Sequence, residues 1–303
     1  MKLWEHYYTP RTFEEASDLL ARHGGAARVV GGGTDLLLEI KQGHRPPVDA
    51  LVDVTHIDAL KHISQEDDHA IIGAAVTHNQ IVRSEMLTQR ATCLVESCGV
   101  VGGPQVRNVG TLAGNVAHAL PAADGTTSLV ALDAEVEVYH NGSIMWVPIQ
   151  EMFQGPGQSL LDSTRDLLLR FRFRLTGERE GSAFKRIMRP QGVALPVLAS
   201  AAWVRLAADL QTIEETRVCI GPVGPVPTRI TVVENALDGN IFSEDLLDEV
   251  VRLARENLKP RTSKYRATSE YRAEMIEVLL RRALPLAVKR ARTGEVVPEG
   301  LGL

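Results

Sequence analysis

The sequence predicts an α+β protein that is divided into two domains. Its 303 residues exceed what a single hydrophobic core usually organises. A polar stretch with two glycines, Thr-Gly-Glu-Arg-Glu-Gly at 176–181, separates the two halves of the chain. Beyond it, the hydrophobic pattern indicates strands first and helices afterwards, a succession that is typical of the α+β class.

Helical and strand patterns alternate at the start of the chain. Thr12, followed three residues later by Glu15, matches a capping box, so we expect a helix over 12–22. The patterns that follow predict a strand at 28–30, a helix or turn at 36–41, strands at 51–54 and 70–73, and a helical segment that begins at 76–78.

A glycine-rich region and a hairpin complete the first half. We expect mainly loop between 99 and 115, because glycine is frequent there and Pro104 lies inside it. Asn141-Gly142 is a strong hairpin signal. The other elements expected here are a buried helix at 122–132 and strands at 134–139, 143–147 and 167–175.

The second half carries an excess of basic residues near its end. Strands are expected at 183–188, 198–206 and 216–220, and helices at 243–257 and 268–284. Between Val251 and Arg292 there are 12 Lys or Arg against 4 Glu. This excess indicates either a solvated helix face or a docking surface for an acidic partner. The last ten residues, from Gly294, predict a loose tail.

The composition argues against several classes of function. A formal net charge of −5 gives no general reason to bind nucleic acid or an anionic membrane. No apolar run approaches the roughly 20 residues that span a bilayer. The first residues have no apolar core behind a basic end, so we expect no secretory signal and a cytoplasmic location. Three cysteines are too few for a disulfide framework or for an iron–sulfur cluster on this chain.

The segment RVVGGGTDLLL, residues 28–38, is the first candidate for a binding site. Backbone amides that are exposed by glycine-rich turns form a concave site for anions, and phosphates are the usual ligand. Three consecutive glycines, from Gly31, let the chain approach a pyrophosphate closely. Thr34 offers a hydroxyl, and Asp35 is suited to cap amides or to accept from a sugar hydroxyl. A tight turn without any ligand is an equal alternative for this segment alone.

Two familiar phosphate motifs are excluded. The dinucleotide fingerprint G-x-G-x-x-G would need glycine at position 36, which is Leu36. A P-loop needs Gly-Lys followed by Ser or Thr, and neither glycine-rich segment contains it.

The second segment, GGPQVRNVGTLAGNVAHALPAAD at 102–124, is more informative. Thr111 and Asn115 offer polar side chains on either side of a small Ala-Gly pair, which suits a cofactor with a pyrophosphate between two ring systems. Asp124 follows a proline turn and is suited to accept from a ribose hydroxyl or an adenine amine. Arg107 either neutralises phosphate or braces the loop, and His118 is more typical of a packing or capping residue than of a base.

Together, VVGGGTDLLLEIK and this second segment resemble the FAD-binding medium subunit of the molybdenum hydroxylases, the xanthine dehydrogenase and carbon monoxide dehydrogenase family. The resemblance covers nearly the whole chain. It implies an FAD-binding domain of the PCMH type over 1–175, with two α/β subdomains at about 1–55 and 56–175. A C-terminal α+β domain over 178–287 and a flexible tail over 288–303 would follow.

The resemblance also implies the residues that contact the FAD, and it implies no catalytic and no metal-ligating residue on this chain. Leu168 would touch the flavin, and Lys185, in the segment Ser-Ala-Phe-Lys, would lie near its polar edge, where a cation favours the reduced flavin. The full set is Val30, Gly31, Gly32, Gly33, Thr34, Asp35, Leu36, Thr111, Gly114, Asn115, His118, Asp124, Leu168 and Lys185.

The function that the resemblance implies is electron transfer within a multi-subunit enzyme. A large subunit would carry the molybdenum cofactor, and a small subunit would carry two [2Fe–2S] clusters. The FAD on this chain would receive the electrons and pass them to NAD⁺ or another acceptor, in what we expect to be a dimer of heterotrimers. The alternatives are a free-standing FAD-dependent oxidase or reductase of the same wider fold, and a non-catalytic assembly module.

Overall fold

A three-stranded parallel sheet forms the first subdomain. The computed structural model describes residues 2–189, 195–263 and 266–301. The strand order is β1 (Trp4–Tyr8), β3 (Val48–Asp53) and β2 (Ala27–Val30), accompanied by helices α1 (Phe13–Arg22) and α2 (Leu36–Lys41). The predicted cap of α1 is confirmed, because Thr12 accepts from the amide of Glu15 at 3.2 Å. The Glu15 side chain accepts from the amide of Arg11 at 2.7 Å, so the capping box is incomplete.

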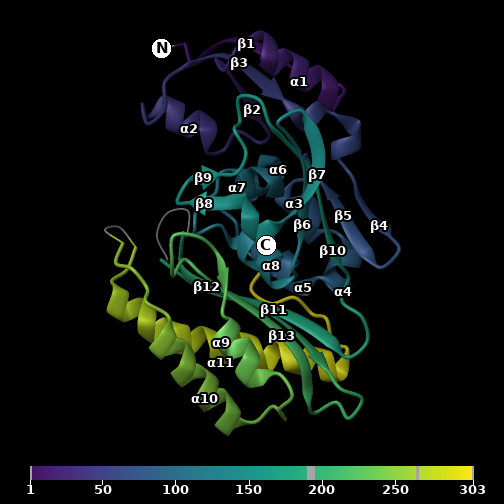
Figure 1. Ribbon diagram of the computed structural model, residues 1–303, viewed down its shortest axis with the longest axis vertical. Coiled ribbons are helices and arrows are strands. Elements are labelled where there is room, and N and C mark those ends of the chain that lie inside the picture. Colours follow the sequence, from purple (N-terminus) through teal and green to yellow (C-terminus); the bar gives the residue numbers. More distant parts are fainter. Residues whose placement is uncertain (1, 190–194, 264–265, 302–303) are drawn as a thin grey trace.

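An antiparallel five-stranded sheet forms the second subdomain (Figure 1). Its order is β4 (Ile63–Glu66), β5 (His69–Gly73), β10 (Leu167–Arg174), β6 (Glu135–His140) and β7 (Ser143–Pro148). Asn141 and Gly142 both have positive φ, at 50° and 81°, as a two-residue hairpin requires. The predicted hairpin is therefore confirmed.

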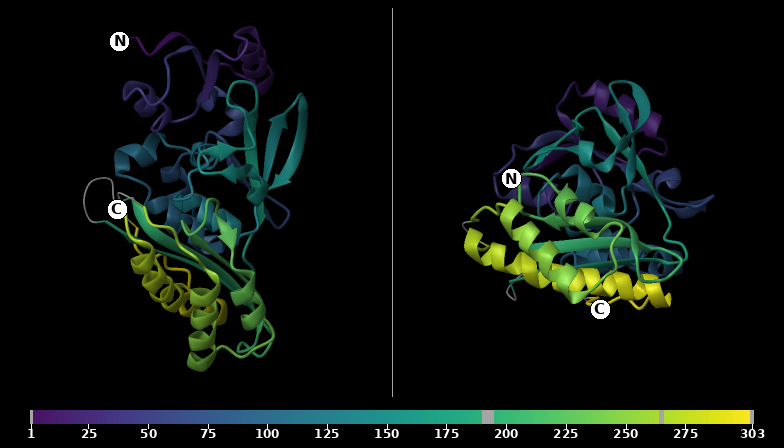
Figure 2. Two further views of the ribbon diagram at one scale, coloured as in Figure 1. Left: turned by 60° about the vertical axis from the view of Figure 1, so that its left-hand side comes forward. Right: turned by 60° about the horizontal axis from the view of Figure 1, so that its bottom comes forward.

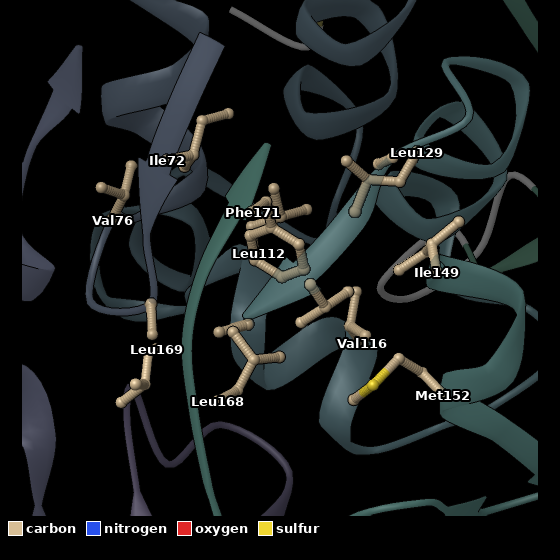
Figure 3. Packing of buried hydrophobic residues seen from close by; sticks show 14 of the residues in the cluster. Ile72, Val76, Leu112, Val116, Leu129, Ile149, Met152, Leu168, Leu169 and Phe171 are labelled. Atoms are coloured by element: carbon tan, nitrogen blue, oxygen red, sulfur yellow. The ribbon is translucent and has the colours of Figure 1, made fainter. Parts of the chain in front are cut away.

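Short helices cover this sheet and form most of the remaining core. They are α3 (His78–Val82), α4 (Glu85–Arg90), α5 (Thr92–Gly99), α6 (Pro104–Val109), α7 (Leu112–Ala117) and α8 (Asp124–Ala131), with a small ribbon of β8 (Phe153–Gly155) and β9 (Gln158–Ser159). Figure 3 shows Phe171 of β10 packed among side chains from these helices, including Leu112, Val116 and Leu129.

One prediction for this region was wrong. The glycine-rich stretch at 99–115, expected to be mainly loop, contains α6 and the start of α7. Pro104 occupies the first turn of α6, where its missing N–H costs nothing, and Thr111 caps α7. Both helices have six residues, which is too short for a hydrophobic period to reveal them.

The C-terminal domain is a four-stranded antiparallel sheet that is covered by helices on its outer face (Figure 2). Its elements are β11 (Glu180–Met188), β12 (Pro196–Leu206), β13 (Ile213–Gly221), β14 (Thr228–Arg229), α9 (Thr231–Leu237), α10 (Glu244–Asn257) and α11 (Ser269–Thr293). The three predicted strands and two predicted helices are present. Ser243 caps α10 by accepting from the amide of Leu246.

Strand β12 joins the cores of the two domains. Ala201 and Trp203 belong to the cluster of the N-terminal domain, whereas Ala202 and Val204 pack with the C-terminal helices. Because neighbouring residues of a strand point to opposite faces, this sheet is buried on both sides. The continuous apolar run of β12 is the sequence pattern that such burial produces.

The end of the chain differs from the expected tail. Helix α11 continues to Thr293, and Gly294, at a φ of 70°, ends it in the left-handed conformation. Residues 295–301 then lie against α5 and β11, where the amide of Glu299 donates to Glu96 at 2.8 Å. Residues 302 and 303 lie outside the described part of the chain.

Structural contacts account for much of the basic excess near the end of the chain. Arg255 of α10 pairs with Glu277 of α11, and Arg281 pairs with the same Glu277 within α11. The guanidinium of Arg272 is buried and donates to the carbonyl of Arg261 at 2.9 Å. Arg290 is buried against Glu96 at 2.7 Å. These contacts support the solvated or packed interpretation for these side chains, and docking of an acidic partner remains an alternative.

Candidate cofactor-binding site

A cleft of about 370 Å³ lies between the two glycine-rich segments and the edge of the C-terminal domain. This volume is within the usual range for small-molecule sites. Twelve of the fourteen predicted contact residues line it: Val30, Gly31, Gly32, Gly33, Thr34, Asp35, Leu36, Thr111, Gly114, Asn115, His118 and Asp124. Segments that are some eighty residues apart in sequence therefore meet in one cavity.

Close backbone contact holds the two segments together. A Cβ on Gly32 would lie 2.0 Å from the carbonyl oxygen of Val109, and a Cβ on Gly31 would lie 3.0 Å from Oγ1 of Thr111. Gly33 has a φ of 67°, in the left-handed region that favours glycine. The glycines are thus required by the approach of one segment to the other as well as by the turn.

Side-chain caps fix the second segment. Oγ1 of Thr111 accepts from the amide of Gly114 at 3.0 Å, so it is the N-cap of α7. The carbonyl of Gly110 accepts from the amide of His78 at 3.0 Å, which attaches the start of α3 to the same turn. Asp35, in contrast, makes no side-chain cap bond to α2, and within the described part of the chain its carboxylate accepts only from Thr34, at 3.3 Å.

Asp124 is the most deeply buried predicted residue with a charge. It is 4% exposed, and its Oδ2 accepts from Nη1 of Arg186 at 2.7 Å. Burial raises the pKa of this carboxyl to about 6, against the opposing effect of Arg186. Arg186 belongs to β11, so this ion pair connects the C-terminal domain to the floor of the cleft.

The other two predicted residues do not line the cleft. Leu168 is buried in the hydrophobic core (Figure 3), and Lys185 forms an ion pair with Glu299. Because side chains alternate along β11, the neighbour Arg186 takes the side that faces the cleft. Contacts of Leu168 and Lys185 with a flavin remain predictions.

Two family models divide the chain between them. A model described as the FAD binding domain in molybdopterin dehydrogenase matches residues 2–173. A model described as the CO dehydrogenase flavoprotein C-terminal domain matches residues 182–287. This chain belongs to the molybdopterin dehydrogenase FAD-binding family.

Relatives of this family member align over almost its full length. The xanthine dehydrogenase FAD-binding subunit of Escherichia coli O157:H7 is 28% identical over 288 residues, which are 94% of this chain and 96% of the relative. The carbon monoxide dehydrogenase medium chain of Hydrogenophaga pseudoflava is 25% identical, over 94% of this chain and 97% of the relative.

A solved structure of carbon monoxide dehydrogenase from the same organism, Hydrogenophaga pseudoflava, superposes with a TM-score of 0.89, at 25% identity. The alignment covers 96% of this chain and 99% of that one. This protein is therefore the FAD-binding medium subunit of an oxidoreductase of the molybdenum hydroxylase family.

The site of this flavoprotein has the properties that FAD requires. Three lining side chains carry a buried polar atom without a hydrogen-bond partner among the described residues: Nδ1 of His78, Oδ1 of Asn115 and Oδ1 of Asp124. Buried polar atoms are usually paired, so groups of this kind along one cavity indicate a polar ligand. The glycine turn at Gly31 to Gly33 lines the same cleft, and exposed main-chain amides of such a turn are the kind of donor that binds phosphate.

Sequence reasoning missed several lining residues. Arg45, Arg186 and Arg266 bring positive charge to the cleft. Glu39 pairs with Arg45 and lies 3.5 Å from Nε2 of His118, so it links α2 to the end of α7. The strand alternation around Lys185 could have revealed Arg186. Arg45 and Arg266 lie in irregular segments, where no pattern of spacing indicates the direction of a side chain.

Proposed function

We propose that this chain receives electrons from [2Fe–2S] clusters on a small subunit and passes them, through FAD in the cleft, to NAD⁺ or another acceptor. A large subunit that carries the molybdenum cofactor would oxidise the substrate, and the three chains would assemble as a dimer of heterotrimers. The observation that carries this proposal is the meeting of the two glycine-rich segments in one cleft.

Each half of the cleft has a separate task in holding the cofactor. The amides of Gly31 to Gly33 donate to the diphosphate, and Thr34 adds a hydroxyl. Thr111, Gly114 and Asn115 form the opposite wall. Asp124, kept in place by Arg186, accepts from the adenosine end. The bound FAD supplies a carrier that takes up single electrons and delivers them in pairs.

We place the clusters on another chain because three cysteines are too few to ligate them. Cys93 and Cys98 lie on α5 and Cys219 on β13, and all three are buried thiols. Burial raises the pKa of Cys93 and of Cys219 to about 12, which disfavours the thiolate that iron needs. Among the described residues there is no group of three or more His, Cys, Asp or Glu that could hold a metal ion.

The names of the relatives support a multi-subunit enzyme. One is called the alpha subunit of a 6-hydroxypseudooxynicotine dehydrogenase complex, and another the FAD subunit of nicotinate dehydrogenase. These names differ in substrate, but both describe one subunit of a dehydrogenase, and the second assigns FAD to that subunit.

None of the helices in the described ranges is long and apolar enough to cross a membrane.

The test is purification of the native assembly through a tag on this chain. We expect two partner chains, with flavin, iron and molybdenum in the preparation, and a visible spectrum that contains flavin and iron–sulfur bands. Substrate should bleach both sets of bands under anaerobic conditions, and NAD⁺ or another acceptor should restore them. Isolation of the chain with flavin but without a cluster-containing partner would contradict the proposal.

A further inference from the structure

The last described residues of the chain form a strap that crosses from one domain to the other. The C-terminal strap, residues 295–301, follows α11 and runs onto α5 of the N-terminal domain. In Figure 1 this end of the chain lies at the height of the boundary between the domains, and the turned views of Figure 2 place it at the edge of the molecule. Leu301 packs against the core of the N-terminal domain, and a Cβ on Gly99 would lie 2.6 Å from its Cδ2. These contacts fix the end of the strap on the N-terminal domain.

A buried carboxylate fixes the strap and β11 together. Glu96 of α5 is 1% exposed, and its two oxygens accept from three groups. The amide of Phe184 donates at 2.7 Å, Nη2 of Arg290 at 2.7 Å and the amide of Glu299 at 2.8 Å. Nη2 of Arg290 also donates to the carbonyl of Val297 at 2.6 Å. One residue of the N-terminal domain therefore holds β11, α11 and the strap.

Three consecutive residues of β11 bind to three different parts of the molecule. The amide of Phe184 is bound to Glu96, the ammonium of Lys185 pairs with Glu299 of the strap, and Arg186 pairs with Asp124 in the cleft. Lys185 and Arg186 point to opposite faces of the strand, so the strap holds β11 from the side away from the cleft.

We propose that the C-terminal strap positions Arg186 in the FAD cleft, acting through the Glu299–Lys185 ion pair on β11. The inference rests on the proposed FAD site, because Arg186 acts there through Asp124. Loss of the strap contact lets this part of β11 shift, so the guanidinium loses its fixed approach to the carboxylate. The strap thus strengthens FAD binding without touching the cofactor.

A double-mutant cycle in the full-length chain tests the proposal. Glu299→Gln, Arg186→Gln and the double variant are compared with the wild type by FAD titration and by the rate of FAD release. We expect Glu299→Gln to weaken FAD binding about two- to fivefold, the range of a partly exposed ion pair. In the Arg186→Gln background the same change should have no further effect, because the group that it positions is gone.

Glu295→Gln is the matched control. Glu295 lies on the same strap, but its ion-pair partner is Lys289 of α11, at 2.7 Å, rather than a residue of β11. We expect this variant to bind FAD like the wild type. Removal of residues 295–303 should act in the same direction as Glu299→Gln, and more strongly, because it also removes Leu301.

The outcomes separate this inference from the proposed function. Equal weakening by Glu299→Gln and Glu295→Gln, additive effects of Glu299→Gln and Arg186→Gln, or no effect of Glu299→Gln would each overturn the positioning role. A general structural role predicts the additive result, since it does not depend on Arg186. Failure of the wild-type chain to bind FAD would instead overturn the site itself.

Discussion

Gly32 lies so close to the second segment that its missing side chain determines whether the cleft exists. The position that a Cβ would take is 2.0 Å from the carbonyl oxygen of Val109 and 2.8 Å from Cα of Gly110. Both neighbours are backbone atoms, which cannot rotate away as a side chain does. Any substitution must therefore separate the two segments that form the opposite walls of the site.

Gly32→Ala is accordingly expected to weaken FAD binding by more than about tenfold and to lower the free energy of unfolding by roughly 1–3 kcal/mol. FAD titration and urea denaturation measure the two effects. Gly224→Ala is the control, because the nearest atom to its new Cβ would be 3.9 Å away, an ordinary contact. Normal FAD affinity in Gly32→Ala would show that the segments are not in contact.

Burial of His78 makes the free energy of unfolding depend on pH, and the sign of this dependence follows from the direction of the pKa shift. The side chain is 2% exposed, and burial, with a smaller contribution from Arg107, lowers its pKa to about 4. The unfolded chain, with a histidine pKa near 6.5, therefore binds more protons than the folded chain between pH 6.5 and 4. The stability that neutral His78 contributes is complete above pH 6.5 and is lost as the pH falls through this window.

Comparison of the wild type with His78→Gln isolates this contribution. Between pH 7.5 and 5.0 the wild type should lose about 2 kcal/mol more of its free energy of unfolding than the variant, at about 1.4 kcal/mol per pH unit below pH 6.5. Urea denaturation at the two pH values measures it. The other histidines are shared by both proteins, so equal losses would mean that His78 is not buried in neutral form.

At the scale of single residues, backbone turns could be predicted from the sequence, whereas the orientation of side chains could not. The turn at Gly31 to Gly33 was predictable because consecutive glycines favour it, whereas the cap that Thr111 forms on α7 was not predicted. Lys185 was placed beside the flavin by resemblance, whereas the structure turns Arg186 toward the cleft and Lys185 toward Glu299. Which face of β11 each side chain occupies is set by packing of the strand against α5 and α11, and a local sequence motif does not contain that information.

Helix α7 illustrates how a short element depends on its cap. Six residues are too few for a stable isolated helix, so α7 persists through Thr111 and through packing of Leu112 and Val116. The same hydroxyl lies 3.0 Å from the position of a Cβ on Gly31. The cap and the contact between the two segments thus use one atom.

Thr111→Ala should cost about 1 kcal/mol of stability and weaken FAD binding, whereas Thr111→Ser should retain most of both. Thermal denaturation and FAD titration distinguish the two variants. If serine failed as badly as alanine, the methyl group rather than the hydroxyl would be the important feature of this residue.

Helices and strands could be predicted where turn residues, caps or a sustained hydrophobic period mark them in the sequence. The hairpin at Asn141-Gly142, the capped helix α1 and the strands of the C-terminal sheet follow from turn residues, caps and alternation. Helices α6 and α7 were missed because glycine is a poor helix former and neither helix has a full apolar period. Strand β4 was missed because its residues are mainly exposed, and it is ordered by pairing with β5.

The two domains are joined through the core as well as along the chain. Ala199, Ala201 and Trp203 of β12 pack with the N-terminal cluster, and the Glu96–Arg290 pair lies between α5 and α11. A family resemblance could predict the order of the domains, but not this shared interior. It arises from residues that are nearly two hundred positions apart.

Removal of one member of that buried pair should destabilise the whole molecule. Arg290→Met is expected to lower the free energy of unfolding by about 3–5 kcal/mol, because it leaves the carboxylate of Glu96 buried without its cation. Urea denaturation measures the change. Arg252→Ala, which breaks the exposed pair with Glu256, should cost less than about 1 kcal/mol. Similar costs for the two would mean that water reaches Glu96.

Strand β10 has a consequence for how the protein is made. It is the last strand of its sheet in sequence, yet it lies between β5 and β6 and hydrogen-bonds to both. During synthesis, Ile72 and Val136 must wait for a strand that ends at Arg174 before their edges are paired. The five-stranded sheet therefore cannot close until residue 174 has been synthesised, and the cleft, which Arg186 and Arg266 also line, is completed later still.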